Sequence, residues 1–380
     1  MGAEGFWFDF VSPQSFLAFR ELDRRGERPA LRPVCLPALF EALQTSGPPL
    51  TQARPEAKAR YLAHELVRNA AALGVVLREP EAHPLDTKLA LSLVAAAKNW
   101  DVARALFEAY WTGAKIDEAE VIARELDLRG LDGAALLRAA ASDGALSALT
   151  QNLKIAIDAG VFDLPTRIEG DEMTFGFTPR ALPLTTSART IDFYFDYASP
   201  FAYLATTQLP RLARAGVAVT LKPIVLGGLF KALGTANVPL FEMSQAKRDY
   251  QLRHLLRSAA AFGVPFRFAT KFPMNTVKAL RLTSIVASEQ RLALALAIFD
   301  AFWVHDRDIS NDDVLQSIAH SVGIDVVAIW PKLELEETKR ALREATDTAM
   351  TIGVFGVPTI VCDSEPFWGQ DQIELVARLF

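Results

Sequence analysis

The chain has 380 residues, of which 51% are hydrophobic and 22% are charged, a composition typical of a soluble protein with two globular domains. Its formal net charge of −5 argues against a nucleic-acid-binding surface, because there is no basic excess to neutralise phosphate groups. The longest apolar runs, such as 292–304, are too short to span a bilayer, and the N-terminus lacks a signal-peptide pattern.

The two cysteines, Cys35 and Cys362, lie far apart and form no CxxC or metal-ligand pattern. The five histidines are scattered, without HExxH or another paired spacing. We therefore expect a protein of the reducing cytoplasm that has neither a disulfide framework nor a metal site.

The sequence contains a degenerate tandem repeat. The stretch GFWFDFVSPQSFLA at residues 5–18 matches DFYFDYASPFAYLA at 192–205, with Ser-Pro at the same place in both. Further matches follow in the same order along the chain, and each half therefore contains one copy of the same unit. These matches pair 32–48 with 222–239, 58–75 with 247–264, 83–87 with 272–276, and 160–166 with 353–359.

The stretch between the two units, residues 174–190, is rich in Pro, Thr and Ser and shows no periodicity, which is typical of a linker. The sequence therefore predicts a first unit at residues 1–176, a linker at 177–189 and a second unit at 190–380.

The second unit begins with an alternating, aromatic-rich stretch at 190–197 that predicts a strand. Pro200 suits the first turn of a helix, and a second strand is expected at 217–226, so the two strands should be parallel. Helical periodicity follows, then a strand at 356–362 and a closing helix at 371–380. This order predicts an α/β layer with a large all-helical insertion. The inserted helices are expected at 244–263, 276–289, 291–304, 311–321 and 334–352.

These motifs as a set resemble the DsbA-like branch of the thioredoxin superfamily. More narrowly, FDYASPFAYL, PIVLGGLFKALG, the Phe-Pro-x-Asn-Thr stretch and GVFGVPT followed by FWGQD are similar to 2-hydroxychromene-2-carboxylate isomerases and kappa-class glutathione transferases. The resemblance covers the whole second unit and, more weakly, the first. It implies two tandem DsbA-like thioredoxin-fold units, each with a large all-helical insertion, and glutathione as the cofactor.

Ser199 stands where redox members of the superfamily carry the first cysteine of C-x-x-C. Because the four positions here are Ser-Pro-Phe-Ala, the chain supplies no thiolate for disulfide exchange at this site. A helix N-terminus favours an anion, and a hydroxyl there can donate to a bound thiolate and lower its pKa. The resemblance implies this catalytic role for Ser199, while an ordinary N-cap remains an alternative that is compatible with it.

The resemblance also implies that Val357 holds the cysteinyl part of glutathione through its main chain, before a cis-Pro358. An ordinary strand-entry proline is the alternative, and the sequence does not decide whether the bond is cis. Gln370 and Asp371 are expected to bind the γ-glutamyl group, although an acidic residue that opens a helix is equally explained as a cap.

The remaining site residues follow from the resemblance alone. Asn237 is assigned to glutathione binding, although its GTANVP loop differs from the tighter Gly-Asn pattern of the family. The predicted substrate pocket includes Tyr203, Asn275 and Trp368; a turn role for Asn275 and a core role for Trp368 are the alternatives.

The first unit keeps Ser12-Pro13 and Leu164-Pro165, but no helical run replaces the closing helix before the linker. We expect it to be a structural partner, so that one chain supplies the pseudo-dimer that family members form from two subunits. Whether the tandem chain forms a further homodimer stays open.

The resemblance favours a glutathione-dependent isomerase that acts on 2-hydroxychromene-2-carboxylate or a related small aromatic compound. The alternatives are a kappa-like glutathione transferase and a non-catalytic thioredoxin-fold binding protein.

Overall fold

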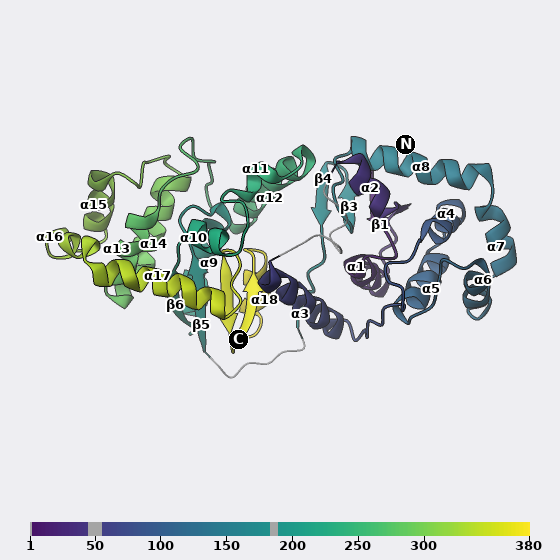
Figure 1. Ribbon diagram of the computed structural model, residues 1–380, viewed down its shortest axis with the longest axis horizontal. Coiled ribbons are helices and arrows are strands. Elements are labelled where there is room, and N and C mark those ends of the chain that lie inside the picture. The colour runs from purple at the N-terminus through teal and green to yellow at the C-terminus, as the bar shows by residue number, and fades with distance from the viewer. Residues whose placement is uncertain (1, 45–54, 183–188) are drawn as a thin grey trace. The chain divides into compact units, whose positions relative to one another are not determined.

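The computed structural model describes residues 2–44, 55–182 and 189–380 (Figure 1). The chain divides into two compact units. The first comprises Met1–Ala53, Ala63–Leu182 and Ser244–Tyr250, and the second comprises Arg54–Leu62, Pro183–Met243 and Gln251–Phe380. Within the described residues each unit contains a four-stranded sheet with helices inserted between its strands. The predicted α/β class, with a repeated thioredoxin-like unit, is therefore confirmed.

The first sheet has the strand order β2-β1-β3-β4. Strands β1 (Gly5–Phe8) and β2 (Leu31–Pro33) are parallel and are connected by helix α1 (Pro13–Arg24). Strands β3 (Thr166–Glu169) and β4 (Glu172–Phe175) follow the helical insertion, and both β1/β3 and β3/β4 are antiparallel. The described residues after β4, 176–182, contain no helix, as the sequence predicted.

Within the described residues, seven helices lie between β2 and β3. They are α2 (Leu36–Ala42), α3 (Glu56–Ala72), α4 (Lys88–Ala97), α5 (Trp100–Trp111), α6 (Ala119–Asp127), α7 (Gly133–Ala140) and α8 (Asp143–Asp158).

The second sheet repeats this order as β6-β5-β7-β8. Strands β5 (Thr190–Phe195) and β6 (Ala218–Pro223) are parallel across helix α9 (Pro200–Arg214), which confirms the predicted strand–helix–strand unit. Strand β7 (Thr359–Cys362) pairs antiparallel with β5 and with β8 (Glu365–Trp368).

The predicted helices of the second unit are present as α12 (Gln245–Phe262), α13 (Val277–Ile285), α14 (Ser288–Trp303), α15 (Asp312–Ser321), α17 (Glu336–Thr351) and α18 (Gln372–Ala377). Four short helices of the described residues were not predicted: α10 (Leu226–Ala232), α11 (Pro239–Glu242), α16 (Val326–Ile329) and the 3₁₀ helix η1 (Trp330–Glu334).

Two strands of the second unit differ from the sequence-based expectation. The strand expected at 217–226 ends at Pro223, because the backbone N–H of Leu226 bonds the Asp196 carboxylate and begins α10. Strand β8 was not predicted; Asp363 and Ser364 adopt positive φ angles and turn the chain back against β7.

Aromatic side chains from the central strands form the core of each unit. In the second unit, Phe193 and Phe195 stack with ring centroids 5.9 Å apart, and Phe195 meets Phe299 of α14 at 5.8 Å. In the first unit, Phe8 meets Phe107 of α5 at 5.2 Å. Each fully buried ring contributes about 2–3 kcal/mol, so these contacts anchor the inserted helices to the sheets.

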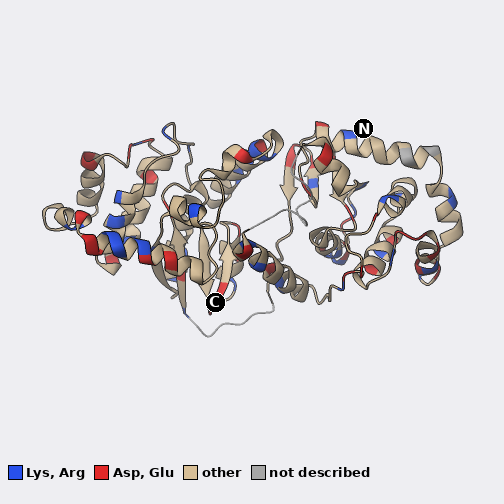
Figure 2. Ribbon diagram, in the orientation of Figure 1, with Lys and Arg blue, Asp and Glu red and all other residues tan. Residues whose placement is uncertain are grey.

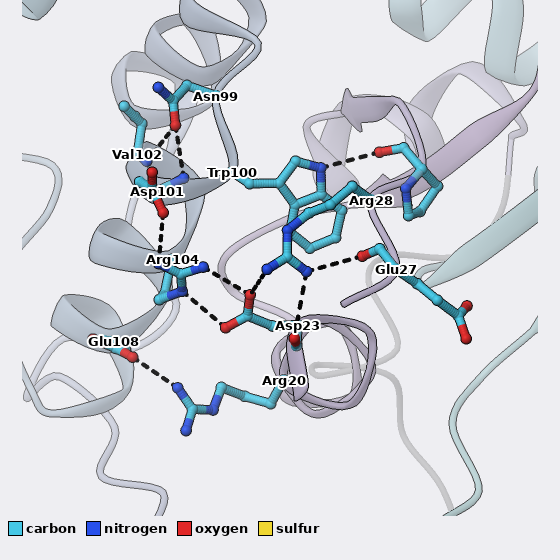
Figure 3. A network of polar contacts seen from close by, with 11 residues as sticks. Arg20, Asp23, Glu27, Arg28, Asn99, Trp100, Asp101, Val102, Arg104 and Glu108 are labelled. Carbon is cyan, nitrogen blue, oxygen red and sulfur yellow. Dashed lines mark hydrogen bonds and ion pairs between the residues drawn. The ribbon is translucent and has the colours of Figure 1, made fainter. Parts of the chain in front are cut away.

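A polar network joins α1 to α5 in the first unit (Figure 3). The Asp23 carboxylate accepts hydrogen bonds from Nε and Nη2 of Arg104, both at 2.8 Å. The hydrogen bond from Arg104 is the main cause of a lowered pKa at Asp23. The Arg28 guanidinium lies 4.8 Å from the centroid of the Trp100 ring and also pairs with Asp23. The network orients α1, whose N-cap is Ser12.

Charged side chains of both signs are interspersed on the surface helices, for example along α17 (Figure 2). None of the described helices combines the length and the apolar character that a membrane span requires.

Candidate functional site

Ser199 is the N-cap of α9, and its side chain is integrated into the start of that helix. Its Oγ accepts a hydrogen bond from the backbone N–H of Ala202 at 3.1 Å, while Pro200 occupies the first helical turn. Only 5% of Ser199 is exposed. The N-cap role is therefore confirmed, and it places the hydroxyl at the positive end of a helix of 15 residues.

Asp196 holds the turn that precedes α9. It is buried, and its carboxylate accepts hydrogen bonds from the Thr276 hydroxyl at 2.6 Å and from the Leu226 N–H at 2.8 Å. Its Oδ1 also accepts from the Ala198 N–H at 3.0 Å. Burial raises the pKa of Asp196, although all three hydrogen bonds oppose that rise. The carboxylate thus ties α10 and α13 to the turn that presents Ser199.

The Val357–Pro358 peptide bond is cis and lies against Ser199. The Ser199 hydroxyl donates to the Val357 carbonyl oxygen at 3.3 Å. The Val357 N–H has no hydrogen-bond partner among the described residues. The hydroxyl at the head of α9 therefore contacts the main chain of the cis-proline bend, and the N–H of the same valine is left without a partner among the described residues.

Gln370 is buried, and its amide is oriented by a histidine that sequence reasoning did not select. The Nε2 atoms of Gln370 and His254 lie 2.7 Å apart. An amide nitrogen can only donate, so His254 Nε2 must be the unprotonated acceptor. Burial lowers the pKa of His254 to about 4, with a smaller effect from Arg257, so the ring is neutral at pH 7. This bond turns the amide oxygen of Gln370 away from the imidazole.

Asp371 is exposed at the N-cap of α18, and its Oδ2 accepts from the Gln372 amide at 3.3 Å. The preceding Gly369 has a φ of +115°, and a Cβ there would collide with Oδ1 of Asp371. Glycine is therefore required for the turn that brings Gln370 and Asp371 together after β8.

Trp368 is half-buried in an aromatic cluster of the second unit. Its ring lies 4.9 Å from Phe355 and 6.3 Å from Tyr61, which the unit takes from helix α3. A Cβ added to Gly356 would lie 2.9 Å from the indole Nε1, so Trp368 requires a glycine next to Val357. The ring is thus a wall beside the cis-proline bend.

Three predicted site residues make other contacts. The Tyr203 hydroxyl donates to the Pro265 carbonyl at 2.6 Å, and this side chain is buried. Asn275 is exposed and accepts from the Val277 N–H at 3.1 Å, the turn contact that was its alternative explanation. Asn237 is exposed, with its Oδ1 2.9 Å from the position that a Cβ on Gly227 would occupy. Their assignment to ligand binding stays a prediction.

The first unit repeats the same bend with one difference. Ser12 caps α1, and its hydroxyl donates to the Leu164 carbonyl at 3.3 Å before a cis Leu164–Pro165 bond. Here, however, the Leu164 N–H donates to the Asp163 carboxylate at 2.8 Å. Asp163 occupies the position of Gly356. The N–H before the cis-proline is therefore hydrogen-bonded in the first unit, whereas in the second unit it has no partner among the described residues.

The repeated sheets, the Ser-Pro helix start and the cis-proline bend agree with comparisons to known proteins. The sequence pattern described as the DSBA-like thioredoxin domain matches residues 5–181 and 190–380. The chain belongs to the DSBA-like thioredoxin domain family. The resemblance to the DsbA-like branch that the sequence predicted is therefore confirmed.

Curated relatives match over about half of this chain and almost all of their own length. A 2-hydroxychromene-2-carboxylate isomerase of Sphingobium xenophagum is 31% identical over 189 residues, which are 50% of this chain and 96% of the relative. Glutathione S-transferase kappa 1 of Rattus norvegicus is 28% identical over 207 residues, which are 50% of this chain and 90% of the relative. A solved 2-hydroxychromene-2-carboxylate isomerase structure is 27% identical, with a TM-score of 0.46 over 50% of this chain and 93% of that protein.

Several residues of the site were not selected from the sequence, because their roles depend on contacts with residues distant in the chain. Asp196 had a signal, since it is identical to Asp9 across the repeat, but its partners are distant in sequence. His254 and Gly356 carry no local signal, because their roles depend on contacts with Gln370 and Trp368.

In the described residues, no group of three or more His, Cys, Asp or Glu side chains is arranged to hold a metal ion.

Proposed function

We propose that the chain is a glutathione-dependent isomerase of 2-hydroxychromene-2-carboxylate or a related aromatic-degradation intermediate. The proposal rests on the relatives with that name and on one structural observation. In the second unit, the Ser199 hydroxyl at a helix N-terminus donates to the carbonyl oxygen of Val357, whose N–H has no partner among the described residues.

The residues of this bend fit a cysteinyl peptide. The Val357 N–H can donate to a ligand carbonyl, and the helix N-terminus favours an anionic sulfur beside it. When bound, glutathione supplies a thiolate that adds reversibly to an unsaturated carbon of the substrate and leaves unchanged after bond rotation. Because the cofactor is released as it entered, the isomerisation needs no oxidant or reductant.

Ser199 stabilises the sulfur anion in this proposal. Its hydroxyl now donates to the Val357 carbonyl at 3.3 Å, a long contact that is easily exchanged. Rotation of the O–H bond toward the sulfur retains the cap bond that Oγ accepts from Ala202. The serine donates a hydrogen bond to the thiolate, which lowers the pKa of the thiol and populates the nucleophile near pH 7.

Gln370 and Asp371 bind the γ-glutamyl end of the ligand. Because His254 fixes the Gln370 amide nitrogen, the amide oxygen is the atom left to accept from an ammonium group. The exposed Asp371 carboxylate adds the negative charge that complements this ammonium. A neutral His254 therefore acts as a positioning residue for the cofactor.

A second candidate function is glutathione transfer to an electrophile, which the kappa-class relatives favour. The same residues would activate the thiol in both reactions. The product distinguishes them, because an isomerase returns free glutathione and a transferase leaves a stable conjugate.

The test compares two matched serines in one chain. We expect Ser199→Ala to lower kcat/KM of glutathione-dependent isomerisation about 100-fold, the loss typical of one donor to a developing anion. Ser12→Ala removes the equivalent cap and should change kcat/KM less than twofold. Conversion of the substrate can be followed by absorbance, with thiol titration to detect conjugates. Equal losses in the two variants, or no conversion by the wild type, would contradict the proposal.

A further inference from the structure

The first unit contains a cavity of about 290 Å³ next to its cis-proline bend. Its apolar walls include Phe6, Leu22, Pro165 and Phe177. The volume is just below the usual range for small-molecule sites, roughly 300–1,000 Å³, so the cavity has space for one small ring compound.

The cavity lies where the second unit carries α18. In that unit α18 packs against α9 and β8 and buries Ile373, Leu375 and Val376. The two units are in register here, because Gly176 N–H bonds the Pro165 carbonyl as Gly369 N–H bonds the Pro358 carbonyl, both at 3.0 Å. The described residues that follow Gly176 form no helix, so the equivalent surface of the first unit is left uncovered by its own closing helix.

The residues that line this cavity have changed chemically as well as structurally. At the position that corresponds to Leu212, the first unit has Arg25, and at the position of Ile360 it has Arg167. Arg180 likewise stands at the position of Ile373. If the first unit had only lost its closing helix, the surface that the helix covered would be apolar. These three positions carry guanidinium groups instead. The lining therefore fits an anionic group above an apolar floor.

Two buried polar atoms of the cavity residues make no hydrogen bond in the described part of the chain. One is Oε1 of Glu21, a residue that is only 8% exposed and whose Oε2 accepts from Arg24 at 2.8 Å. The other is Nε of Arg167, whose Nη1 donates to Glu27 at 2.7 Å and whose Nη2 donates to Glu169. Both atoms are also almost completely covered, so a ligand with one donor and one acceptor satisfies them once the Glu21 and Arg167 side chains turn toward the cavity.

The charges around the cavity select a monoanion. Four arginines, at 24, 25, 167 and 180, stand against three glutamates, at 21, 27 and 169, so four minus three leaves one positive charge. We propose that this cavity is a binding site for a small ring-containing monocarboxylic acid that also carries a hydroxyl group. The carboxylate lies toward Arg167 and Arg25, the hydroxyl donates to Glu21, and the ring rests on Phe6 and Leu22. The site is separate from the glutathione site of the second unit.

The probe for this site is salicylate, which combines an aromatic ring, one carboxylate and one hydroxyl. Saturation-transfer NMR and calorimetry on the full chain should give saturable binding at millimolar concentrations. Benzyl alcohol, which has the ring but no charge, should bind at least tenfold more weakly.

Two variants test the location of the site. Arg167→Ile installs the residue of the second unit and should weaken salicylate binding at least tenfold. Glu21→Gln should weaken it by a smaller factor. Ala18→Trp fills the cavity from α1 without a change of charge, and it keeps the test decisive if Arg167→Ile does not fold. Ser199→Ala should bind salicylate as the wild type does. Absence of saturable binding, or equal affinity in wild type, Arg167→Ile and Ala18→Trp, would overturn the proposal.

Discussion

The two cis-proline bends of this chain differ at one residue that controls the main chain. Both have a serine that caps the following helix and donates to the carbonyl before the proline at 3.3 Å. In the first unit Asp163 accepts the Leu164 N–H, whereas Gly356 of the second unit leaves the Val357 N–H open. A shared fold and a shared serine therefore do not suffice for a shared site.

Trp368 explains why the second unit needs a glycine at position 356. A Cβ on Gly356 would approach the indole Nε1 to 2.9 Å, and the first unit has the smaller Phe175 in the matching place. The side chain of Asp163 is compatible with Phe175 but an equivalent one would not be compatible with Trp368. The aromatic wall and the open N–H are thus linked features of the second unit.

The largest effect is expected when Gly356 of the second unit is exchanged for Asp163, the residue at the same position of the first unit. Gly356→Asp should place a carboxylate on the Val357 N–H and displace Trp368, because the new Cβ meets the indole. We expect the Kd of glutathione to rise at least 100-fold, about 3 kcal/mol, from the lost hydrogen bond and the repulsion of the thiolate. Thermal-shift titration with glutathione measures this change.

The matched control is Asp163→Gly, which opens the Leu164 N–H of the first unit. Because the described residues 176–182 form no closing helix and Phe177 stands at the position of Gln370, we expect no second glutathione to bind. Unchanged affinity in Gly356→Asp would show that the Val357 main chain does not hold the cofactor.

His254 should make the second unit sensitive to acid. Burial lowers its pKa to about 4, so the unfolded chain takes up a proton between about pH 6.5 and pH 4 that the folded unit resists. The stability that His254 confers is full above pH 6.5 and is lost as pH falls toward 4. We expect this loss to be about 2 kcal/mol, allowing for its partial exposure.

Two substitutions separate the roles of His254. In His254→Gln, an amide oxygen can still accept from Gln370, so glutathione should bind within threefold of wild type while the acid-dependent loss disappears. His254→Leu removes the acceptor, and the released Gln370 should weaken glutathione binding about fivefold. Melting temperatures at pH 7 and pH 4.5 give the first result. A wild-type difference retained in His254→Gln would rule out His254 as the cause.

The smallest effect concerns the polar network of the first unit. Asp23→Asn weakens the paired bonds to Arg104 and should lower the melting temperature by an amount equivalent to about 1 kcal/mol, since the pair is partly exposed. The wild-type contribution should be present above pH 4 and lost on acidification, because the pKa of Asp23 is lowered in the fold. Glutathione affinity measured on the same variant should be unchanged.

The repeat and the local signals at Ser199, Pro200 and the helical periodicity were sufficient to predict the tandem units, the parallel strand pair and the helix cap. Strand β8 was not predicted because it is defined by its pairing with β7, which depends on the turn at Asp363 and Ser364. Short strands are defined by their partners more than by their own sequence.

For the candidate site, local signals selected some residues, and contacts between residues distant in sequence could not be predicted. Ser199 and Val357 are marked by adjacent prolines, whereas Tyr203 was assigned to the pocket from family resemblance. The structure gives its hydroxyl a bond to the Pro265 carbonyl, a contact between residues distant in sequence. His254 lies 116 positions from Gln370, so no local pattern could have paired them.

The most direct test is calorimetric titration of the full chain with glutathione. Our account predicts one equivalent per chain, with the heat of binding greatly reduced in Gly356→Asp and retained in Asp163→Gly. Two equivalents per chain, or a single one that survives Gly356→Asp, would contradict it.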